Sequence, residues 1–319
     1  MTKFRLKNKL WLLLFLLLIG ETGQAQKDTL SFLHITDLHT MFNLENYDPE
    51  VVKHREYTRG YKNANLFLKQ FMQTVPEKTN SDLVIATGDL IDFFDAKTPG
   101  GKTLEYQLEQ FARFLDEFHF PLYLTIGNHD LFSFNWGNNR VIPDQNQTGR
   151  AKAAWIRNFD CFRNGTYYSR TFEVGKTMYR LIFLDNGFYQ FRKEENIVNP
   201  YIDKPQLHWL RAELTESEDD IEIILMHIPF TETSALPESK NELYAELAQH
   251  PSVKLIFAGH HHKGAVMRFA LEGNHELVQV GSDALVSSPE NWRLVRLTEN
   301  NILVSVTGKT ENELIVPIK

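Results

Sequence analysis

Five short apolar runs along the chain are each followed at once by polar residues of the kinds that bind metals. The runs have strand length and lie at 29–36, 82–87, 120–126, 221–226 and 253–258. The side chains that follow them are Asp37 and His39, then Asp89, then Asn128, His129 and Asp130, then His227, and finally His260, His261 and His262. In open α/β sheets, ligands bind beyond the carboxyl ends of the strands. The pattern therefore predicts that all five groups converge on one rim.

Segments with helical periodicity alternate with these runs. Apolar residues recur at spacings of three and four in 63–75, 105–118, 204–216 and 241–250, which is typical of amphipathic helices. Strand and helix in alternation predict parallel strand pairing with crossover helices.

Further apolar stretches predict additional strands. Residues 167–186 predict a hairpin that turns at Gly175 and Lys176 and then continues as another sheet strand. Residues 275–308 predict closing antiparallel strands, which we expect to form a second sheet packed on the first and not a separate domain.

The segment 131–164 has weaker periodicity and follows His129 and Asp130 directly. It predicts a loop or a short helical insert over the site. Its aromatic side chains include Phe132, Phe134, Trp136 and Trp155. These side chains either shape a substrate pocket or form a satellite apolar cluster under a long loop, and the sequence leaves both open.

The composition is that of an ordinary globular protein, with 42% hydrophobic and 24% charged residues in a chain of 319. The net charge of -7 argues against a nucleic-acid duplex as partner, because binding to a phosphate backbone needs a basic surface. A small phosphorylated substrate remains compatible, since a local site can be positive within an acidic protein. The oligomeric state does not follow from the sequence.

Residues 1–25 have the pattern of a cleavable signal peptide, with a basic start, an apolar core at 10–19 and small residues at 23–25. The apolar core is shorter than the roughly 20 residues that span a bilayer. We therefore expect an exported, periplasmic or secreted protein without a stable membrane anchor, and an uncleaved anchor is the alternative. The mature domain is expected at 28–319, with its motifs in 30–265 and closing strands in 266–319. Cys161 is the one cysteine, so no intramolecular disulfide is expected, and a buried inert thiol is its simplest interpretation.

The three consecutive histidines at 260–262 admit three interpretations. They are an accidental polar cluster on a loop, a surface tract that scavenges metal, or a shaped metal site that uses only some of them. Residues two apart on an extended strand exit face the same side. In the third interpretation, His260 and His262 therefore bind metal while His261 faces away, and Asp37 and His39 repeat this spacing.

The number of ligand-type side chains predicts two metal ions. A catalytic zinc ion takes three protein ligands and one water. The candidate ligands are more numerous: Asp37, His39, Asp89, Asn128, His227, His260 and His262. Asp89 is the expected bridging ligand, since its carboxylate has two oxygens and follows an expected central strand. Paired ions activate a shared water and hold the oxygens of an in-line displacement at phosphorus.

The order of these groups resembles a known family. Asp37-x-His39, Gly88-Asp89, Gly127-Asn128-His129-Asp130, His227 and Gly259-His260-x-His262 resemble the five-block signature of the calcineurin-like metallophosphoesterases, most closely the class III cyclic-nucleotide phosphodiesterase branch. The resemblance implies an α/β fold, a four-layer α/β/β/α sandwich of two mixed β-sheets flanked by helices, around a dinuclear metal centre.

The resemblance also implies individual roles. It assigns one ion to Asp37, His39 and His262 and the other to Asn128, His227 and His260, with Asp89 bridging. It implies that His129 contacts the phosphate and assists the leaving group. A carboxylate beside a histidine can hold its ring and favour its charged form, and this is the role expected of Asp130.

One position departs from a branch of the same superfamily. Purple acid phosphatases carry a tyrosine three residues after the aspartate of the second block, and this chain has Asp92 there. Tyrosine ligation of a ferric ion is therefore not expected. Asp92 is interpreted either as the start of a helix, which we favour, or as a group that supports the ligands.

The expected function is that of an exported, binuclear metal-dependent hydrolase of phosphate esters, with diesters favoured and a metal-bound hydroxide as nucleophile. The ions are expected to be Mn, Fe or Zn, divalent or mixed-valence, because imidazole, carboxylate and amide ligands suit all of these. The alternatives are a phosphomonoesterase or nucleotide pyrophosphatase that uses the same site, and a non-catalytic binding module on the same scaffold.

Overall fold

The computed structural model describes residues 27–192, 197–200, 202–217, 219–230, 242–272 and 275–318. The expected signal peptide, residues 1–25, lies outside these ranges, so its cleavage stays a prediction. Within the described ranges, no helix is both long enough and apolar enough to cross a membrane.

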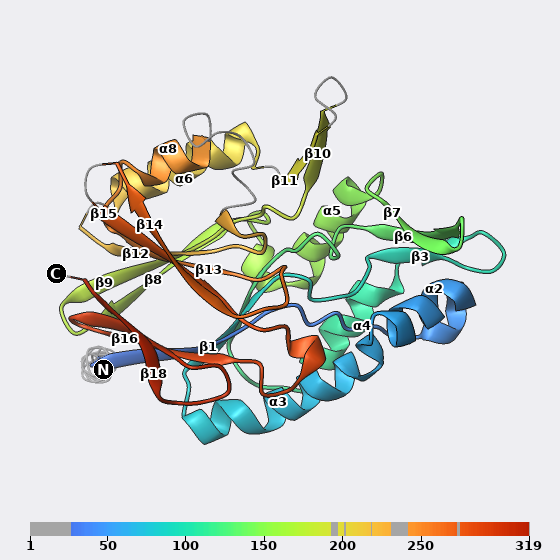
Figure 1. The fold of residues 1–319 in the computed structure, drawn as a ribbon, viewed down its shortest axis with the longest axis horizontal. Helices are drawn as coiled ribbons and strands as arrows, with labels where there is room; N and C mark the ends of the chain where they lie inside the picture. Colours follow the sequence, from blue (N-terminus) through green and yellow to red (C-terminus); the bar gives the residue numbers. More distant parts are fainter. Residues whose placement is uncertain are drawn as a thin grey trace, which may run out of the picture.

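Two six-stranded sheets form the centre of the molecule (Figure 1). The first sheet has the order β18-β17-β16-β1-β2-β5. Its strands are β1 (Thr29–Ile35), β2 (Leu83–Thr87), β5 (Leu122–Thr125), β16 (Arg293–Thr298), β17 (Asn301–Ser305) and β18 (Asn312–Pro317). The second sheet has the order β14-β15-β13-β12-β9-β8. Its strands are β8 (Tyr168–Val174), β9 (Thr177–Phe183), β12 (Ile221–Leu225), β13 (Val253–Ala258), β14 (Ala265–Leu271) and β15 (His275–Gly281).

Helices cover the outer faces of both sheets, which completes the expected four layers. Figure 1 shows α3 (Ala64–Thr79) below the first sheet, α4 (Tyr106–Leu115) to the right of it, and α6 (Lys204–Glu216) and α8 (Glu242–Leu247) above the second sheet. Both sheets are mixed. In the first, β1 is parallel to β2 but antiparallel to β16. In the second, β12 is parallel to both β9 and β13, whereas β8 is antiparallel to β9. The predicted fold class is therefore confirmed.

Strand β12 shows how the layers are held together. Ile223 and Leu225 pack in the core that joins the two sheets, whereas Ile224 and Met226 pack in the core beneath α6 and α8. Successive side chains of a strand point to opposite faces. A strand covered on both faces is therefore apolar without alternation, which explains the continuous apolar run at 223–226.

Smaller elements surround this centre. A four-stranded sheet consists of β3 (Asp95–Lys97), β4 (Thr103–Leu104), β6 (Ser133–Gly137) and β7 (Arg140–Asp144), and a separate pair consists of β10 (Tyr189–Arg192) and β11 (Ile197–Pro200). The further helices are α2 (Pro49–Lys53), α5 (Thr148–Asn158) and the π-helix η2 (His54–Thr58). The 3₁₀ turns are η1 (Leu44–Asn46), η3 (Tyr61–Asn63), η4 (Asp160–Phe162) and η6 (Leu285–Ser287). The segment 131–164 is thus an ordered insert that holds β6, β7 and α5, and not a loop.

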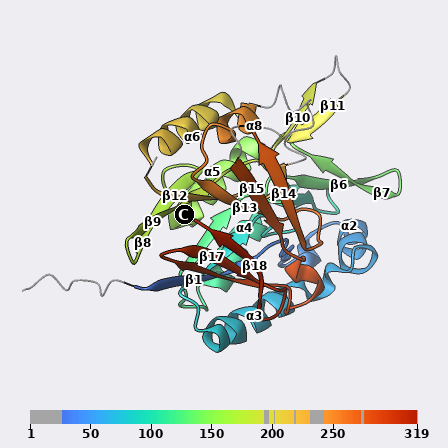
Figure 2. The ribbon, with the colours of Figure 1, turned by 60° about the vertical axis from the view of Figure 1, so that its left-hand side comes forward.

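The closing strands differ from the prediction. They do not form a sheet of their own, because β14 and β15 extend the second sheet and β16, β17 and β18 extend the first (Figure 2). In addition, β15 pairs in parallel with β13. The reason is β14, for which no strand was predicted although six of its seven residues are apolar. It reverses the chain after β13, so β15 runs in the direction of β13. The predicted hairpin at Gly175 and Lys176 is present as β8 and β9.

Candidate metal centre

All the predicted site residues lie just beyond the carboxyl ends of strands. Asp37 and His39 follow β1, Asp89 follows β2, and Asn128, His129 and Asp130 follow β5, all in the first sheet. His227 follows β12, and His260 and His262 follow β13, both in the second sheet. The five groups therefore converge on one rim, as predicted, and this rim is shared by the two sheets.

The ligand-bearing loops have an unusual backbone. Asp37, His39, Asp89, His260 and His262 have φ angles of 52°, 45°, 48°, 71° and 60°. Left-handed conformations of residues other than glycine cost free energy and concentrate at functional sites. The assumption that Asp37, His39, His260 and His262 lie on extended strand exits is therefore wrong. In each pair, two left-handed residues are separated by one residue that is not left-handed. This irregular backbone, and not a continuing strand, brings the paired side chains together.

Two glycines allow these loops to approach one another closely. A Cβ atom on Gly127 would lie 2.2 Å from the backbone nitrogen of Asp89 and 2.3 Å from its Oδ1 atom. A Cβ atom on Gly259 would lie 1.9 Å from the Thr36 hydroxyl oxygen and 2.7 Å from Asp37 Oδ2. A side chain at either position would thus push the ligand-bearing loops apart.

The first cluster consists of Asp37, His39, Asp89 and His262, whose ligand atoms lie within 4.8 Å of one another. The Nε2 atoms of His39 and His262 are 3.1 Å apart. His262 Nε2 lies 3.3 Å from Asp37 Oδ1, and His39 Nε2 lies 3.6 Å from Asp89 Oδ2. Nitrogen and oxygen lone pairs this close together form a donor set that suits a cation.

The second cluster consists of Asp89, His227 and His260, whose ligand atoms also lie within 4.8 Å of one another. The His227 Nε2 atom is 3.2 Å from Asp89 Oδ2 and 3.2 Å from the amide oxygen of Asn128. The other ring nitrogen of His227 donates to the carbonyl of Thr87 at 2.8 Å, which turns Nε2 toward the cluster. Asp89 belongs to both clusters, as expected of a bridging ligand.

Protonation in these clusters also fits metal binding. Burial lowers the pKa of His39 and of His260 to about 4 each, so both rings are neutral at neutral pH, the form that binds metal. Burial alone would raise the pKa of Asp89, but His227 and His129 bring that pKa well below its usual value. For His227, burial lowers the pKa but Asp89 raises it to about 9. The carboxylates of the clusters thus attract positive charge, and a set of imidazole, carboxylate and amide donors suits transition-metal ions.

His129 is placed beside the clusters and is partly exposed. Its ring packs edge-on against the His39 ring at 4.6 Å between centroids. Its backbone N–H donates to Asp89 Oδ1 at 2.8 Å, and its Nδ1 atom lies 2.7 Å from the carbonyl oxygen of Asp92. With Nδ1 protonated toward this carbonyl, Nε2 remains available for other contacts.

Asp92 supports the site and does not begin a helix, so the interpretation favoured from the sequence is wrong. Its carboxylate contacts His39 Nδ1 at 3.0 Å and His129 Nδ1 at 3.5 Å. Arg55 donates to both of its oxygens, at 2.6 Å each. Burial alone would raise the pKa of Asp92, but Arg55 holds that pKa well below its usual value. A carboxylate that receives the second ring N–H of a ligand histidine fixes its orientation.

Asp130 does not hold the His129 ring as predicted. Its carboxylate accepts hydrogen bonds from the backbone N–H groups of Gly127, Leu90 and Ile91 at 2.7 to 3.0 Å. Burial, followed by the charge of Asp89, raises the pKa of Asp130 well above its usual value. Asp130 therefore joins the loops after β2 and β5, and Asp92 takes the role expected of it.

The apolar-cluster interpretation of the aromatic insert is confirmed for Trp155, while a substrate pocket shaped by Phe132 and Phe134 stays a prediction. The Phe132 and Phe134 rings lie 6.2 and 5.6 Å from the His129 ring, at the site. Trp155 is buried among Phe111, Phe159 and Phe162 in the apolar cluster beneath the insert.

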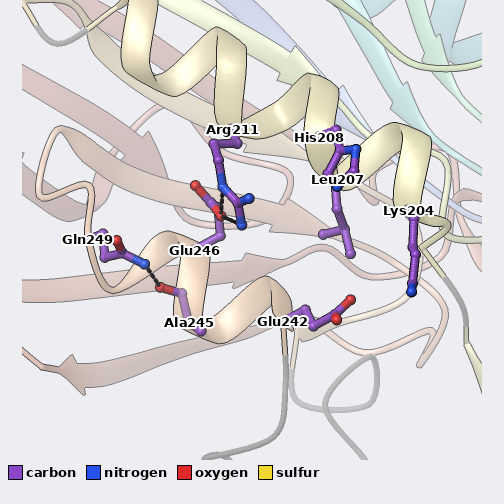
Figure 3. Close-up of a pocket in the computed structure, with 8 residues that line it drawn as sticks. All are labelled: Lys204, Leu207, His208, Arg211, Glu242, Ala245, Glu246 and Gln249. Atoms are coloured by element: carbon purple, nitrogen blue, oxygen red, sulfur yellow. Dashed lines mark hydrogen bonds and ion pairs between the residues drawn. The ribbon is translucent and has the colours of Figure 1, made fainter.

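A hollow of about 260 Å³ lies elsewhere, between α6 and α8 (Figure 3). It contains none of the predicted site residues. Arg211 lies within it and already pairs with Glu246 at 2.7 Å. The hollow is therefore separate from the chemistry of the clusters.

Three residues of this region were not singled out as site residues from the sequence. Arg55 comes from the π-helix η2, for which no sequence pattern was apparent. Asp185 and Asn186 follow β9, and Asn186 contacts the backbone of His227. A signal for this pair existed, because an apolar strand followed at once by polar residues is the pattern that marked the five other groups.

Comparison with known proteins agrees with this geometry. The sequence profile of the calcineurin-like phosphoesterases matches residues 30–264. No curated protein sequence matches the chain. A dimetal phosphatase from Danio rerio has a similar structure, with a TM-score of 0.60 and 15% identity over 91% of this chain and 99% of that chain.

Two further solved structures are similar. A purple acid phosphatase, PPD1, from yellow lupin (Lupinus luteus) seeds has a TM-score of 0.55 and 14% identity over 92% of this chain and 54% of that chain. GAP50, the anchor in the inner membrane complex of Plasmodium, has a TM-score of 0.51 and 12% identity over 91% of this chain and 89% of that chain. At these identities the likeness concerns the fold.

The profile match covers most of the chain, and the structure brings together the buried aspartates and histidines that a dinuclear centre requires. The chain belongs to the calcineurin-like phosphoesterase family of metal-dependent phosphoric ester hydrolases.

Proposed function

We propose that this protein is an exported phosphodiesterase with two metal ions bound between its two sheets. The observation that carries the proposal is the shared position of Asp89 between the two clusters. Asp37, His39 and His262 would hold one ion, Asn128, His227 and His260 would hold the other, and Asp89 would bridge them. When bound, such a pair activates a water molecule and neutralises charge that develops on the phosphate oxygens.

The protein's own residues would position the substrate and move a proton. The backbone contact to Asp89 and the Nδ1 contact to the Asp92 carbonyl hold His129 beside the clusters. Its Nε2 atom would donate a proton to the departing oxygen, the usual task of a histidine near neutral pH. Phe132 and Phe134 make the surroundings of His129 apolar, which favours an organic group on the leaving oxygen and supports the preference for diesters.

The test compares two chromogenic substrates, bis(p-nitrophenyl) phosphate and p-nitrophenyl phosphate. Protein stripped with a chelator is assayed alone and after addition of Mn²⁺, Zn²⁺ or Fe²⁺. We expect metal-restored hydrolysis with a higher kcat/KM for the diester. If neither ester is hydrolysed with any metal, the proposed activity is wrong. If only the monoester is hydrolysed, the diester preference is wrong.

One observation favours the phosphomonoesterase alternative. Arg59 is exposed, and its Nη2 atom donates to the Tyr61 hydroxyl at 3.2 Å. The Tyr61 ring in turn stacks on the His39 ring at 4.5 Å. A cation in this position would attract the second negative charge of a monoester. In that case Arg59→Ala would lower kcat/KM for the monoester far more than for the diester, whereas Arg157→Ala, at an exposed arginine of α5, would change neither.

Export is part of the proposal and has a separate test. It is supported by the basic start, the apolar core at 10–19 and the small residues at 23–25. Expression of the full chain in a Gram-negative host, followed by fractionation and intact mass measurement, should give a periplasmic product that lacks about 25 residues. A full-length product in the membrane fraction would indicate a retained anchor instead.

A further inference from the structure

Asn186 is a fully buried amide just beyond strand β9, and His227 lies just beyond the neighbouring strand β12. Strands β9 and β12 are parallel neighbours, with Phe183 paired to Leu225. The residues that follow the two strands therefore leave the sheet side by side. This places Asn186 next to the backbone of His227 and Ile228.

The Asn186 side chain forms three hydrogen bonds with this backbone. Its oxygen accepts hydrogen bonds from the N–H groups of His227 and Ile228, at 3.1 Å each. Its amide nitrogen donates to the Ile228 carbonyl at 2.7 Å. These three hydrogen bonds hold the turn that directs His227 toward the second cluster.

The neighbour of Asn186 touches the other side of the same cluster. A Cβ atom on Gly187 would lie 2.6 Å from the carbonyl carbon and oxygen of Gly127 and 3.1 Å from the backbone nitrogen of Asn128. The short segment 186–187 therefore contacts the two backbone segments that carry Asn128 and His227. The amide oxygen of Asn128 and Nε2 of His227 are 3.2 Å apart.

Helix α6 fixes this segment from behind. The Gln206 side chain accepts from the backbone N–H of Asp185 and donates to its carbonyl, both at 2.8 Å. Asp185 also forms an ion pair with Lys152 of helix α5 at 2.6 Å. Through Asp185, Asn186 is therefore held by helices α5 and α6, which contribute no residue to either cluster. These contacts restrict the movement of Asn186 and so of the His227 backbone that it binds.

We infer that Asn186 is a positioning residue that sets the distance between Asn128 and His227 and thereby the affinity for the second ion. The inference rests on the metal centre proposed above. Asn186 binds the backbone of His227 and Ile228, whereas Asp92 and Arg55 support the first cluster. The loss of Asn186 should therefore weaken one ion and spare the other.

The test is titration of metal-free full-length protein with Mn²⁺, followed by electron paramagnetic resonance and calorimetry. Mn²⁺ reports stoichiometry directly, since a coupled pair and an isolated ion give different spectra. For wild type we expect two ions per chain and a coupled spectrum. For Asn186→Ala we expect one tightly bound ion with an isolated-ion spectrum, and a second ion bound about 10- to 100-fold more weakly, as for the loss of other groups that orient ligands.

The matched control is Asn65→Ala. Asn65 binds the backbone of Met41 in the same way, accepting from its N–H at 2.9 Å and donating to its carbonyl at 2.8 Å, but it contacts no ligand residue through these bonds. This variant should keep two ions and the coupled spectrum. Asn186→Asp is measured alongside, because it keeps an acceptor for both N–H groups and should fold even if the alanine variant does not. It should weaken the second ion less than alanine does.

The outcomes separate this inference from the proposed function. If wild type does not bind two ions, the dinuclear proposal itself is wrong. If wild type binds two and both Asn186 variants bind two with unchanged affinity, Asn186 has no positioning role. Equal weakening of both ions in the Asn186 variants, or the same loss in Asn65→Ala, would show general loosening of the fold and would also overturn the inference.

Discussion

The two clusters share Asp89 but are supported in different ways. In the first, His39 Nδ1 contacts the carboxylate of Asp92, which is itself held by Arg55. In the second, His227 Nδ1 donates to a backbone carbonyl, and neutral side chains hold the surrounding loop. A carboxylate partner makes a ligand imidazole more basic than a carbonyl partner does. The difference indicates that affinity for the first ion would depend on the charge beside its ligand histidine. Affinity for the second would depend on how firmly the backbone that carries His227 is held.

The substitution Asp89→Ala should have the largest effect, because it removes the one residue that the clusters share. Among the remaining ligands only Asp37 carries a negative charge, and it belongs to the first cluster alone, so the bridging charge is not replaced and we expect loss of both ions. Since paired ions contribute several kcal/mol to transition-state stabilisation, activity should fall about 10³-fold or more. Metal analysis and kcat/KM measure the two effects. Retention of one tightly bound ion would show that the clusters are independent.

Substitution of the consecutive histidines tests whether each cluster takes one of them. His260→Ala should weaken the second ion and His262→Ala the first, each by more than the roughly 10- to 100-fold caused by loss of an outer partner. His261→Ala should have little effect, since His261 is exposed and belongs to neither cluster. Calorimetric titration of the three variants distinguishes these results. Equal losses at all three positions would support an undifferentiated histidine tract.

Asp92→Asn tests the charged support of the first cluster. It should weaken the first ion by about 10- to 100-fold. It should also destabilise the protein by about 3 to 5 kcal/mol, because the Arg55 charge stays buried without its partner. Metal titration and chemical unfolding measure the two effects. If affinity for the second ion fell equally, the support of the first cluster by Asp92 and that of the second by Asn186 would not be independent.

Asp95→Asn is the matched control and should have the smallest effect. Asp95 is a buried carboxyl three residues further on, with no hydrogen-bond partner for its Oδ2 atom among the described residues. Burial raises the pKa of Asp95 to about 6. Its contribution to stability is therefore complete below pH 3.8 and is lost as pH rises through about 6.

Metal-free wild type should accordingly lose stability relative to Asp95→Asn between pH 4 and pH 6, by about 1 kcal/mol after allowance for solvent screening. Chemical unfolding at several pH values measures this difference. Metal binding should be unchanged. If Asp95→Asn weakened metal binding as much as Asp92→Asn, the loss would come from any change in this part of the chain and not from the missing charge of Asp92.

The sequence predicted the main strands and the side chains that gather into the two clusters, but it did not predict how they are brought together. Apolar runs such as 223–226 reveal buried strands, because burial on both faces excludes polar residues. The partition into two sheets depends on which strands pair, and an apolar run does not specify its partner. Strand β14 was not predicted, although six of its seven residues are apolar. The left-handed backbone of His260 and His262 is likewise set by contacts between loops, not by local preference. The role of Asp92 depends on Arg55, which is 37 residues away in the sequence.

The position of the site between two sheets has a consequence for the durability of the protein. Asp37, His39, Asp89 and Asn128 follow strands of one sheet, and His227, His260 and His262 follow strands of the other. Bound ions would therefore act as cross-links between segments up to 225 residues apart, from Asp37 to His262. With Cys161 as its one cysteine, the chain cannot form an internal disulfide. Metal bound to the folded state alone would raise the unfolding temperature, so metal-loaded protein should resist heat and proteases better than the stripped form.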